Sequence, residues 1–313
     1  MKIIDPHLHL FNLDQGDYHW LKADNPPFWP DKSIISKNFI EQDLTLNQPL
    51  HLAGFVHIEA GFDNLDPWRE VAWLEQHCRK PFRTIAFLDL SLEVSAFKSG
   101  LNKLKQFSSV VGIRHIFDDD ALALQVLTQV KENLALVAEQ ALLFELQMPL
   151  DNLAAVDKLI TIAADIPMLQ LIINHAGWPT LNSTENNTEN NTEINAKNSA
   201  WLTGLQRLSQ VANCAIKCSG WEMSDRTYQL DAIKIVINDC LEYFGDDRVM
   251  LASNFPLCLF SHSYQGYWQN QIKLLKQLDS HQRSKKLNKQ LSIDLLKEKL
   301  CYSNAQRWYK FDN

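Results

Sequence analysis

The segment KIIDPHLHLF, residues 2–11, is the part of the chain from which fold and function can first be inferred. A short apolar run leads into two histidines, His7 and His9, with one residue between them. Side chains alternate between the faces of a β-strand, so a strand over residues 2–9 places both imidazoles on one face, beside Asp5. Two such imidazoles can bind a divalent metal or orient a water or a carbonyl group. The alternative is a pair of solvated histidines near a frayed terminus, and the rest of the chain decides between them.

Apolar segments with β-forming residues recur along the chain. They predict eight strands, at residues 3–9, 52–59, 84–90, 110–117, 141–148, 169–175, 214–219 and 249–254. Apolar residues at spacings of three and four predict helices between them, at 66–77, 94–105, 121–140, 152–166, 200–211 and 230–244. Eight strands that alternate with helices predict an α/β protein, a (β/α)8 TIM barrel. A doubly wound open sheet is the alternative, but no Gly-X-Gly-X-X-Gly motif follows any predicted strand.

Two segments interrupt the alternation. Residues 12–49 form a long insertion after the first strand, rich in tryptophan and proline, which is either a lid or wall at the barrel mouth or a purely structural excursion. Residues 181–199 are polar and of low complexity, and we expect a surface loop without chemistry. The C-terminal part is predicted to be helical, at 267–278 and 287–300. We therefore expect one domain over residues 1–313.

Composition excludes several classes of partner. Apolar residues make up 46% of the 313 residues and charged residues 21%, with a net charge of −7, which indicates a globular protein. There is no run of lysine and arginine, so we expect no nucleic acid, and no apolar run is long enough for a membrane span. No leader precedes the His-X-His motif, and the six scattered cysteines suggest free, buried thiols, so we expect a cytoplasmic protein. Homo-oligomerisation is left open.

Polar side chains collect where the predicted strands end. In (β/α)8 enzymes the active site lies at the carboxyl ends of the strands. Seven of the eight predicted strands end in titratable or amide residues: His7 and His9, His57 and Glu59, Arg114 and His115, Glu145 and Gln147, Asn174 and His175, Lys217 and Ser219, and Ser253 and Asn254. Any one of these is more simply explained as a hydrogen-bonded structural residue. Together they suit hydrolysis, in which imidazoles bind a metal or polarise a carbonyl and a carboxylate activates water.

Several of these motifs resemble those of a known family. They are the His-X-His strand, NHAGWP at 174–179 and ASNFP at 252–256, with DYHWL at 17–21, HIEA at 57–60, GIRH at 112–115 and SNAQRWY at 303–309. The chain is similar nearly end to end to the amidohydrolase superfamily. It most resembles the amidohydrolase-related (amidohydrolase 2) group, which includes sugar lactonases and 2-pyrone-4,6-dicarboxylate lactonase.

The resemblance implies a hydrolase that opens a lactone or a similar small cyclic ester. It implies that His7, His9 and His175 polarise the substrate or bind a metal. Arg114 is placed to hold a substrate carboxylate, which its planar guanidinium suits. His57 and His115 are further candidates for substrate binding, and Trp20 for a wall of the site.

The chain departs from the family at the eighth strand. Characterised members typically have an aspartate there, which takes the proton from the attacking water, whereas this chain has Asn254. An amide cannot accept a proton at neutral pH. The base would then be another group, with Glu59 the first candidate by type and position and Glu145 the next. An unmetallated histidine is a further alternative.

Metal use is also left open by the sequence. Gln147 replaces a ligand of binuclear members, so we expect at most one divalent metal, Zn or Mn, on His7, His9 and His175. Metal-free action is the alternative, since some members of the group work without a metal. Two other functions compete with the lactonase. One is a non-catalytic small-molecule-binding relative, suggested by Asn254, and the other is a metal-dependent decarboxylase.

Overall fold

Eight parallel strands form one sheet in the computed structural model, which describes residues 1–117, 128–181, 191–278 and 292–311. The strands of these described residues pair in chain order: β1 (Lys2–Leu8), β2 (His51–Ile58), β3 (Phe82–Phe87), β4 (Val110–Ile116), β5 (Leu143–Gln147), β6 (Gln170–Ile173), β7 (Cys214–Cys218) and β8 (Val249–Leu251). The sheet then returns to β1. The N–H of Asn254 donates to the carbonyl of His7 at 2.9 Å, and the N–H of His9 to that of Phe255 at 2.6 Å. The predicted (β/α)8 barrel is confirmed.

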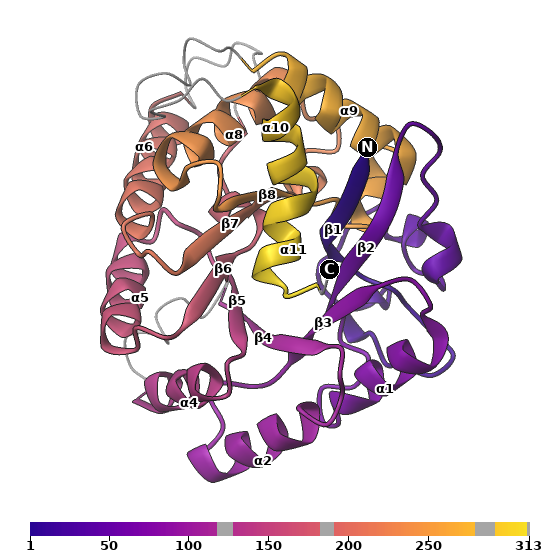
Figure 1. Cartoon of the computed structure of the whole chain (residues 1–313), viewed down its shortest axis with the longest axis vertical. Coiled ribbons are helices and arrows are strands. Elements are labelled where there is room, and N and C mark those ends of the chain that lie inside the picture. Colours follow the sequence, from indigo (N-terminus) through magenta and orange to yellow (C-terminus); the bar gives the residue numbers. More distant parts are fainter. Residues whose placement is uncertain (118–127, 182–190, 279–291, 312–313) are drawn as a thin grey trace.

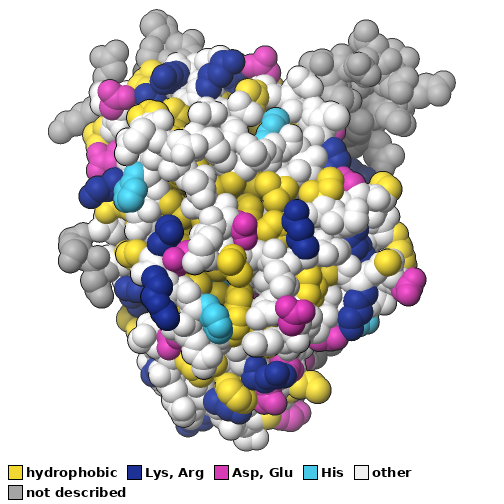
Figure 2. Space-filling view, turned by 90° about the vertical axis from the view of Figure 1, so that its right-hand side faces the viewer, with side chains coloured by type: hydrophobic (Ala, Val, Ile, Leu, Met, Phe, Trp, Pro, Cys, Tyr) yellow, Lys and Arg dark blue, Asp and Glu magenta, His cyan; other side chains and the backbone are white. Residues whose placement is uncertain are grey.

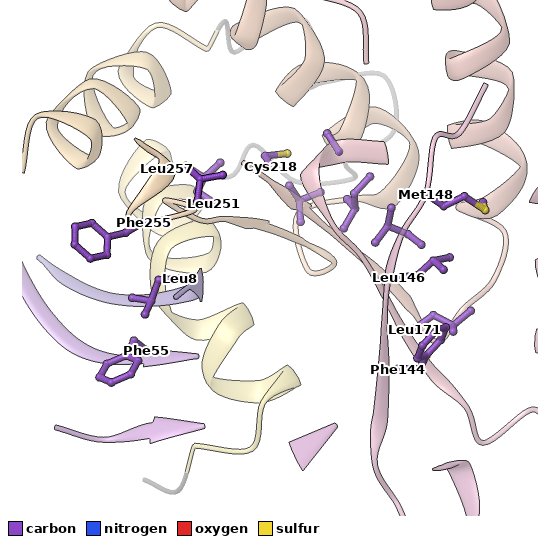
Figure 3. Close-up of a cluster of buried hydrophobic side chains, with 14 of the residues drawn as sticks. Leu8, Phe55, Phe144, Leu146, Met148, Leu171, Cys218, Leu251, Phe255 and Leu257 are labelled. Atoms are coloured by element: carbon purple, nitrogen blue, oxygen red, sulfur yellow. The ribbon is translucent and has the colours of Figure 1, made fainter. Parts of the chain in front are cut away.

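Helices surround the strands (Figure 1). The bounds of the larger helices are α1 (Trp68–His77), α2 (Val94–Leu104), α4 (Thr128–Glu139), α5 (Leu153–Asp165), α6 (Asn191–Leu208), α8 (Leu230–Phe244) and α9 (Tyr264–Lys276). Buried side chains on the outer face of the strands, such as Phe55, Phe144 and Leu171, belong to the apolar layer between sheet and helices (Figure 3). Each helix buries one apolar stripe against this layer, which is why the spacings of three and four located the helices.

A second apolar cluster fills the barrel towards the amino ends of the strands. Ile4, Leu143, Ile172 and Met250 pack there against the C-terminal helix α11 (Asn304–Trp308) and the residues after it. Helix α11 follows α10 (Ile293–Glu298) and a π-helical turn at Lys299–Ser303, and together they cross the end of the barrel (Figure 1). This cluster leaves only the carboxyl ends of the strands for polar side chains.

The insertion after β1 contains three short 3-10 helices, at His19–Leu21, Lys32–Ile34 and Glu41–Asp43. It contacts segments that follow the strands: Trp20 Nε1 donates to the carbonyl of Ala60 at 2.8 Å, after β2. Asp31 accepts from Arg226 Nε at 2.9 Å, after β7. Segments after strands lie at the barrel mouth, so the insertion forms a wall there, the first of the two alternatives.

The polar loop predicted at residues 181–199 is too long. Residues 182–190 lie outside the described part, but 191–199 form the first half of α6. A helix satisfies its own backbone hydrogen bonds even where its side chains are polar, and here it continues into the buried Trp201 and Leu205. Similarly, residues 121–127 and 287–291 of two predicted helices lie outside the described residues.

The predictions from composition can be compared with the surface. All six cysteines are free and buried, as expected. Figure 2 shows lysine and arginine mixed with aspartate and glutamate on the face in view, without a large basic area. Among the helices that the structure describes, none is long and apolar enough to cross a membrane.

Candidate active site

The histidines of β1 are held in place by Asp5, which ties β1 to the segment after β8. Its carboxylate accepts from Ser253 N at 3.1 Å, from Ser253 Oγ at 2.5 Å and from Tyr264 OH at 3.1 Å. Asp5 is fully buried, and this burial raises its pKa to about 6 against the lowering effect of the hydrogen bonds. The role of Asp5 is therefore to fix the strand from which His7 and His9 project.

The fold brings the three predicted histidines together. The ring centroids of His7 and His9 are 5.1 Å apart, and those of His7 and His175 are 4.6 Å apart. All three are buried, with exposures of 0%, 6% and 3%. Burial, followed by nearby cations, lowers the pKa of each histidine well below its usual value. All three imidazoles are therefore neutral at pH 7.

The neighbours of the rings fix different tautomers. His9 Nδ1 lies 2.8 Å from the carbonyl of Ile58 and must donate to it, so its Nε2 carries a lone pair. His7 Nδ1 lies 3.4 Å from Lys217 Nζ, an ammonium that can only donate, so the proton of His7 is on Nε2. His175 Nδ1 pairs with Ser219 Oγ at 3.0 Å, which allows either tautomer. His7 is thus a hydrogen-bond donor towards the site, and His9 is an acceptor.

Lys217 is held in the barrel interior by Glu145. Lys217 Nζ donates to the two carboxylate oxygens of Glu145 at 2.7 and 2.6 Å, and Tyr309 OH donates to the same carboxylate at 2.6 Å. Both charged groups are fully buried. Burial lowers the pKa of Lys217 to about 8 although Glu145 opposes the shift. Glu145, the second candidate for the base, is thus held as the counter-ion of a lysine.

Glu59 and Arg114, predicted as base and substrate anchor, contact each other. Arg114 Nε donates to Glu59 Oε1 at 2.8 Å, and Arg114 Nη2 donates to the carbonyl of Glu59 at 2.9 Å. Arg114 Nη1 reaches Gln147 Oε1 only at 3.4 Å. The carboxylate of Glu59 is therefore committed to a buried ion pair, while Nη1 is the less firmly held end of the guanidinium.

The structure places His57 and His115 away from the barrel interior. Val56 and Ile58 belong to the inner apolar cluster, so the alternation of β2 turns His57 outwards to helix α1. There its Nε2 lies 3.0 Å from Glu70 Oε1, and its Nδ1 accepts from Leu10 N at 3.2 Å. Both ring nitrogens are thus used by the protein. The geometry corrects the prediction: His57 holds the segment after β1 and does not face a substrate.

His115 is turned outwards by the same alternation of side chains along β4. Arg114 points into the barrel, so His115 points to the outer side, where its Nδ1 lies 3.9 Å from Asp89 Oδ1. Its ring packs on Phe117 at a centroid distance of 4.6 Å. His115 supports the segment after β3 and does not lie among the site histidines, which corrects the second prediction.

Asn254 contacts a carboxylate that the sequence analysis missed. Asn254 Nδ2 donates to Glu222 Oε1 at 2.7 Å. Glu222 lies in α7 (Trp221–Ser224), the short helix after β7, and is fully buried. Burial raises its pKa to about 7. In the sequence Glu222 stands three residues after the seventh predicted strand, 214–219, and so was not among the residues at the strand ends.

Unpaired polar atoms mark the centre of the site. Within the residues that the structure describes, His7 Nε2, both amide atoms of Asn174 and Glu222 Oε2 are buried without a hydrogen-bond partner. These side chains come from the carboxyl ends of β1 and β6 and from the segment after β7. Buried polar groups are rarely left unpaired, so these atoms are candidates for contact with a substrate or water.

Strained backbone is found at the same place. His175, Ala176 and Trp178 after β6, and Asn254 after β8, are non-glycine residues with φ between 52° and 58°. Such conformations cost of order 1–3 kcal/mol each and persist where the surroundings fix them. Here they fix the direction of the side chains of His175 and Asn254.

The sequence allowed one divalent metal on His7, His9 and His175. Among the residues that the structure describes, no group of three or more His, Cys, Asp and Glu side chains is arranged to hold a metal ion. The tautomer of His7 agrees with this, because its Nε2 carries a proton where a ligand needs a lone pair. As arranged, His7, His9 and His175 do not fit a three-histidine metal site.

Comparisons with known proteins identify the family. The model of the amidohydrolase family Amidohydro_2 matches residues 4–311. An uncharacterized protein of Sinorhizobium fredii, y4mH, is 26% identical over 281 residues, which cover 85% of this chain and 89% of that protein.

Two solved structures show the same fold. One is an amidohydrolase from Burkholderia multivorans with bound zinc, with a TM-score of 0.73, 17% identity and all of both chains covered. The other is a proposed 2-pyrone-4,6-dicarboxylic acid hydrolase from Pseudomonas putida, with a TM-score of 0.66 and 17% identity, covering 99% of this chain and 98% of that one. At these identities the likeness concerns the fold alone.

Proposed function

Because the chain belongs to the amidohydrolase family, we propose that it is a hydrolase that opens a small lactone or a related cyclic ester. The observation that carries this proposal is His7 Nε2, a buried N–H donor without a partner in the protein. A lactone carbonyl gains negative charge when water adds to it, and a donor fixed in a water-poor site stabilises that charge. The hydrolase named among the structural relatives, with a cyclic ester as its substrate, supports the same class of reaction.

The side chains have separate roles in this mechanism. His7 donates from Nε2 to the carbonyl oxygen of the substrate, and Lys217 keeps His7 in the required tautomer. His9 and His175 line the same space, and the side chain of His9 also hydrogen-bonds with that of Asn254. Asn174 offers both an N–H and a carbonyl to the ring substituents of the lactone.

Arg114 is proposed to bind a carboxylate of the substrate. Its Nη1 makes the longest of the hydrogen bonds of this guanidinium, 3.4 Å to Gln147, and is the nitrogen proposed to donate to the substrate. Trp20 forms part of the wall through its contact with Ala60. A carboxylated lactone should therefore bind more tightly than its uncharged analogue.

The test is a screen of purified protein against sugar lactones and carboxylated lactones. Acid release at constant pH reports ring opening, and parallel samples contain a chelator, Zn²⁺ or Mn²⁺. We expect turnover that survives the chelator, and a loss of roughly 10²-fold or more in kcat for His7→Phe, which removes the donor. Lys131→Met, on an exposed helix, is the control.

The other outcomes identify the competing functions. Release of CO2 from a carboxylated substrate would replace the proposal with a decarboxylase. Tight binding of a lactone without turnover under any condition would replace it with a binding protein.

A further inference from the structure

We propose that Glu222 is the group that accepts the proton of the attacking water, so that the segment after β7 supplies the carboxylate that residue 254 lacks. The inference rests on the proposed hydrolysis and deepens it by naming the base.

The position of Glu222 is fixed through Asn254. Asn254 Nδ2 donates to Glu222 Oε1 at 2.7 Å, and the backbone N–H of Asn254 donates to the carbonyl of His7 at 2.9 Å. The side chain of Asn254 also hydrogen-bonds with that of His9, which opposes the lowering of the pKa of His9. Asn254 thus connects the carboxylate of Glu222 with His9 through its side chain and with His7 through its backbone.

The second oxygen of Glu222 is free to accept a proton. Oε2 is buried and has no hydrogen-bond partner among the described residues. A base needs such a lone pair, within reach of a water in a dry site, and a pKa near the working pH. Burial, which raises the pKa of Glu222 to about 7, meets the last condition.

The charges around Glu222 are few. Arg226 is the charged group that lowers the pKa of Glu222. Arg226 itself donates two hydrogen bonds to Asp31. The other titratable groups that face it are Tyr228, Tyr267 of α9 and Cys258 after β8. Burial raises the pKa of all three, so they are neutral near pH 7. No ion pair therefore fixes Glu222, as described, in its charged form.

The other buried carboxylates of this region are already committed. Glu59 is paired with Arg114, and Glu145 with Lys217 and Tyr309. Asp5 accepts from both the backbone and the hydroxyl of Ser253 and from Tyr264. Glu222 differs from these three because its Oε2 is buried and has no hydrogen-bond partner among the described residues.

Asn254 and Glu222 complement each other. An aspartate at residue 254 would place two carboxylates within hydrogen-bonding distance, and one of them would hold a proton because like charges disfavour ionisation. The amide instead donates to Oε1 and directs Oε2 away from itself. The substitution at the eighth strand and the glutamate after the seventh strand are therefore parts of one arrangement.

In the proposed reaction the water oxygen bonds to the carbonyl carbon of the lactone, and one water proton passes to Glu222 Oε2. The electron pair of the carbonyl bond moves to the carbonyl oxygen, which accepts a hydrogen bond from His7. The tetrahedral intermediate then reforms the carbonyl and breaks the ring C–O bond. The ring oxygen takes the proton from Glu222, which gives a hydroxy acid and returns the carboxylate.

The variant Glu222→Gln tests the proposal, because it keeps the shape and removes the proton acceptor. We expect kcat to fall by roughly 10²–10⁴-fold, the usual contribution of a general base, with KM changed less than about threefold. In the wild type, kcat/KM should rise with pH through about 7, and this rise should be absent from Glu222→Gln. The control is Asp239→Asn on α8, a carboxyl with a pKa raised to about 6 by burial, which should keep the wild-type profile.

A measurement on the wild type makes the test independent of the folding of the variant. Glutamate labelled with ¹³C at its carboxyl carbon should show one NMR signal that titrates near pH 7 and is absent from Glu222→Gln. Titration of that signal below pH 5, or activity of Glu222→Gln within threefold of the wild type, would overturn the assignment of Glu222 alone. A wild type that opens no lactone would overturn the proposed hydrolysis as well, so the two failures are distinguishable.

Discussion

At the scale of single residues, the chemistry of the site depends on which neighbour each imidazole has. His7, His9 and His175 are all neutral and buried, yet the carbonyl of Ile58 makes His9 an acceptor and the ammonium of Lys217 makes His7 a donor. In the proposed hydrolysis the donor, His7, would face the substrate oxygen. The same residue type thus has different hydrogen-bonding states at the two positions because the contacts differ.

The exchange of carboxylate and amide between residues 222 and 254 gives the first prediction. Asn254→Asp should reduce kcat at pH 7 by at least tenfold and move the pH optimum upwards, because the two carboxylates would share one proton. The double variant Asn254→Asp with Glu222→Gln should recover part of this loss, since one carboxylate then again faces one amide. A pH profile of kcat measures both effects. If Asn254→Asp alone and the double variant had equal kcat values, residues 222 and 254 would not be coupled as proposed.

The buried pair of Lys217 and Glu145 gives the second prediction. Lys217→Met leaves Glu145 as an uncompensated buried charge, so the free energy of unfolding should fall by about 3–5 kcal/mol. Lys131→Met is the matched control, since Lys131 and Asp165 form an exposed pair at 2.6 Å whose loss should cost less than about 1 kcal/mol. Urea unfolding checks both values, and equal losses would show that the burial of the pair is unimportant.

At the scale of elements, the segments after the strands decide where the functional groups lie. His175, Glu222 and Asn254 all come after the last residue of β6, β7 or β8, and two of them have a positive φ. Short connections in strained conformations turn these side chains towards the barrel axis. The strands supply a rigid frame, while the connections supply the direction of each group.

Gly220, between β7 and α7, gives the third prediction. Its φ is +76°, and a Cβ there would lie 2.6 Å from His175 Nδ1. Gly220→Ala should therefore displace the ring of His175 and lower kcat by roughly tenfold or more. Gly245→Ala is the control, because its φ of +72° carries the same strain but its Cβ would have no atom within 4 Å. Only Gly220→Ala should lower kcat, and equal activity losses in the two variants would contradict the clash with His175.

At the scale of the whole molecule, burial of many ionisable groups in one barrel determines how stability depends on pH. Four buried histidines have lowered pKa values: His7, His9, His57 and His175. Below about pH 6.5 these histidines bind protons in the unfolded state but not in the folded state, so their contribution to stability is lost as pH falls. Three buried carboxyls, Asp5, Glu70 and Glu222, have raised pKa values and act in the opposite sense. Their contribution to stability is lost as pH rises from about 4 to the pKa that each has in the folded state, about 6 for Asp5 and about 7 for Glu222.

The two effects together give the fourth prediction. Below about pH 6 the four histidines outweigh the three carboxyls. Between about pH 6.5 and pH 7 the histidines no longer titrate in the unfolded state, whereas Glu222 and Glu70 still lose protons on unfolding, so the free energy of unfolding should be greatest near pH 6.5. In Glu222→Gln a group that loses its proton near pH 7 is gone, so the maximum should move to higher pH. Urea unfolding at pH 5 to 8 measures its position, and a maximum that stays in place would contradict the raised pKa of Glu222.

Much of the architecture followed from local patterns. Eight β-forming segments and the helices between them were found because their apolar side chains repeat at fixed spacings, and the same spacings persist in the folded barrel. The helical start of α6 was missed because polar residues carry no such pattern.

The sequence by itself determined the barrel, and it predicted a candidate site at the carboxyl ends of the strands with three histidines, since these depend on residue type and on spacing within each strand. Only the tertiary structure decided that Arg114 neutralises Glu59, that His57 faces α1 and that Glu222 meets Asn254. These contacts join residues from different strands and helices. Their partners depend on the register and twist of the closed sheet, which no spacing along the chain specifies.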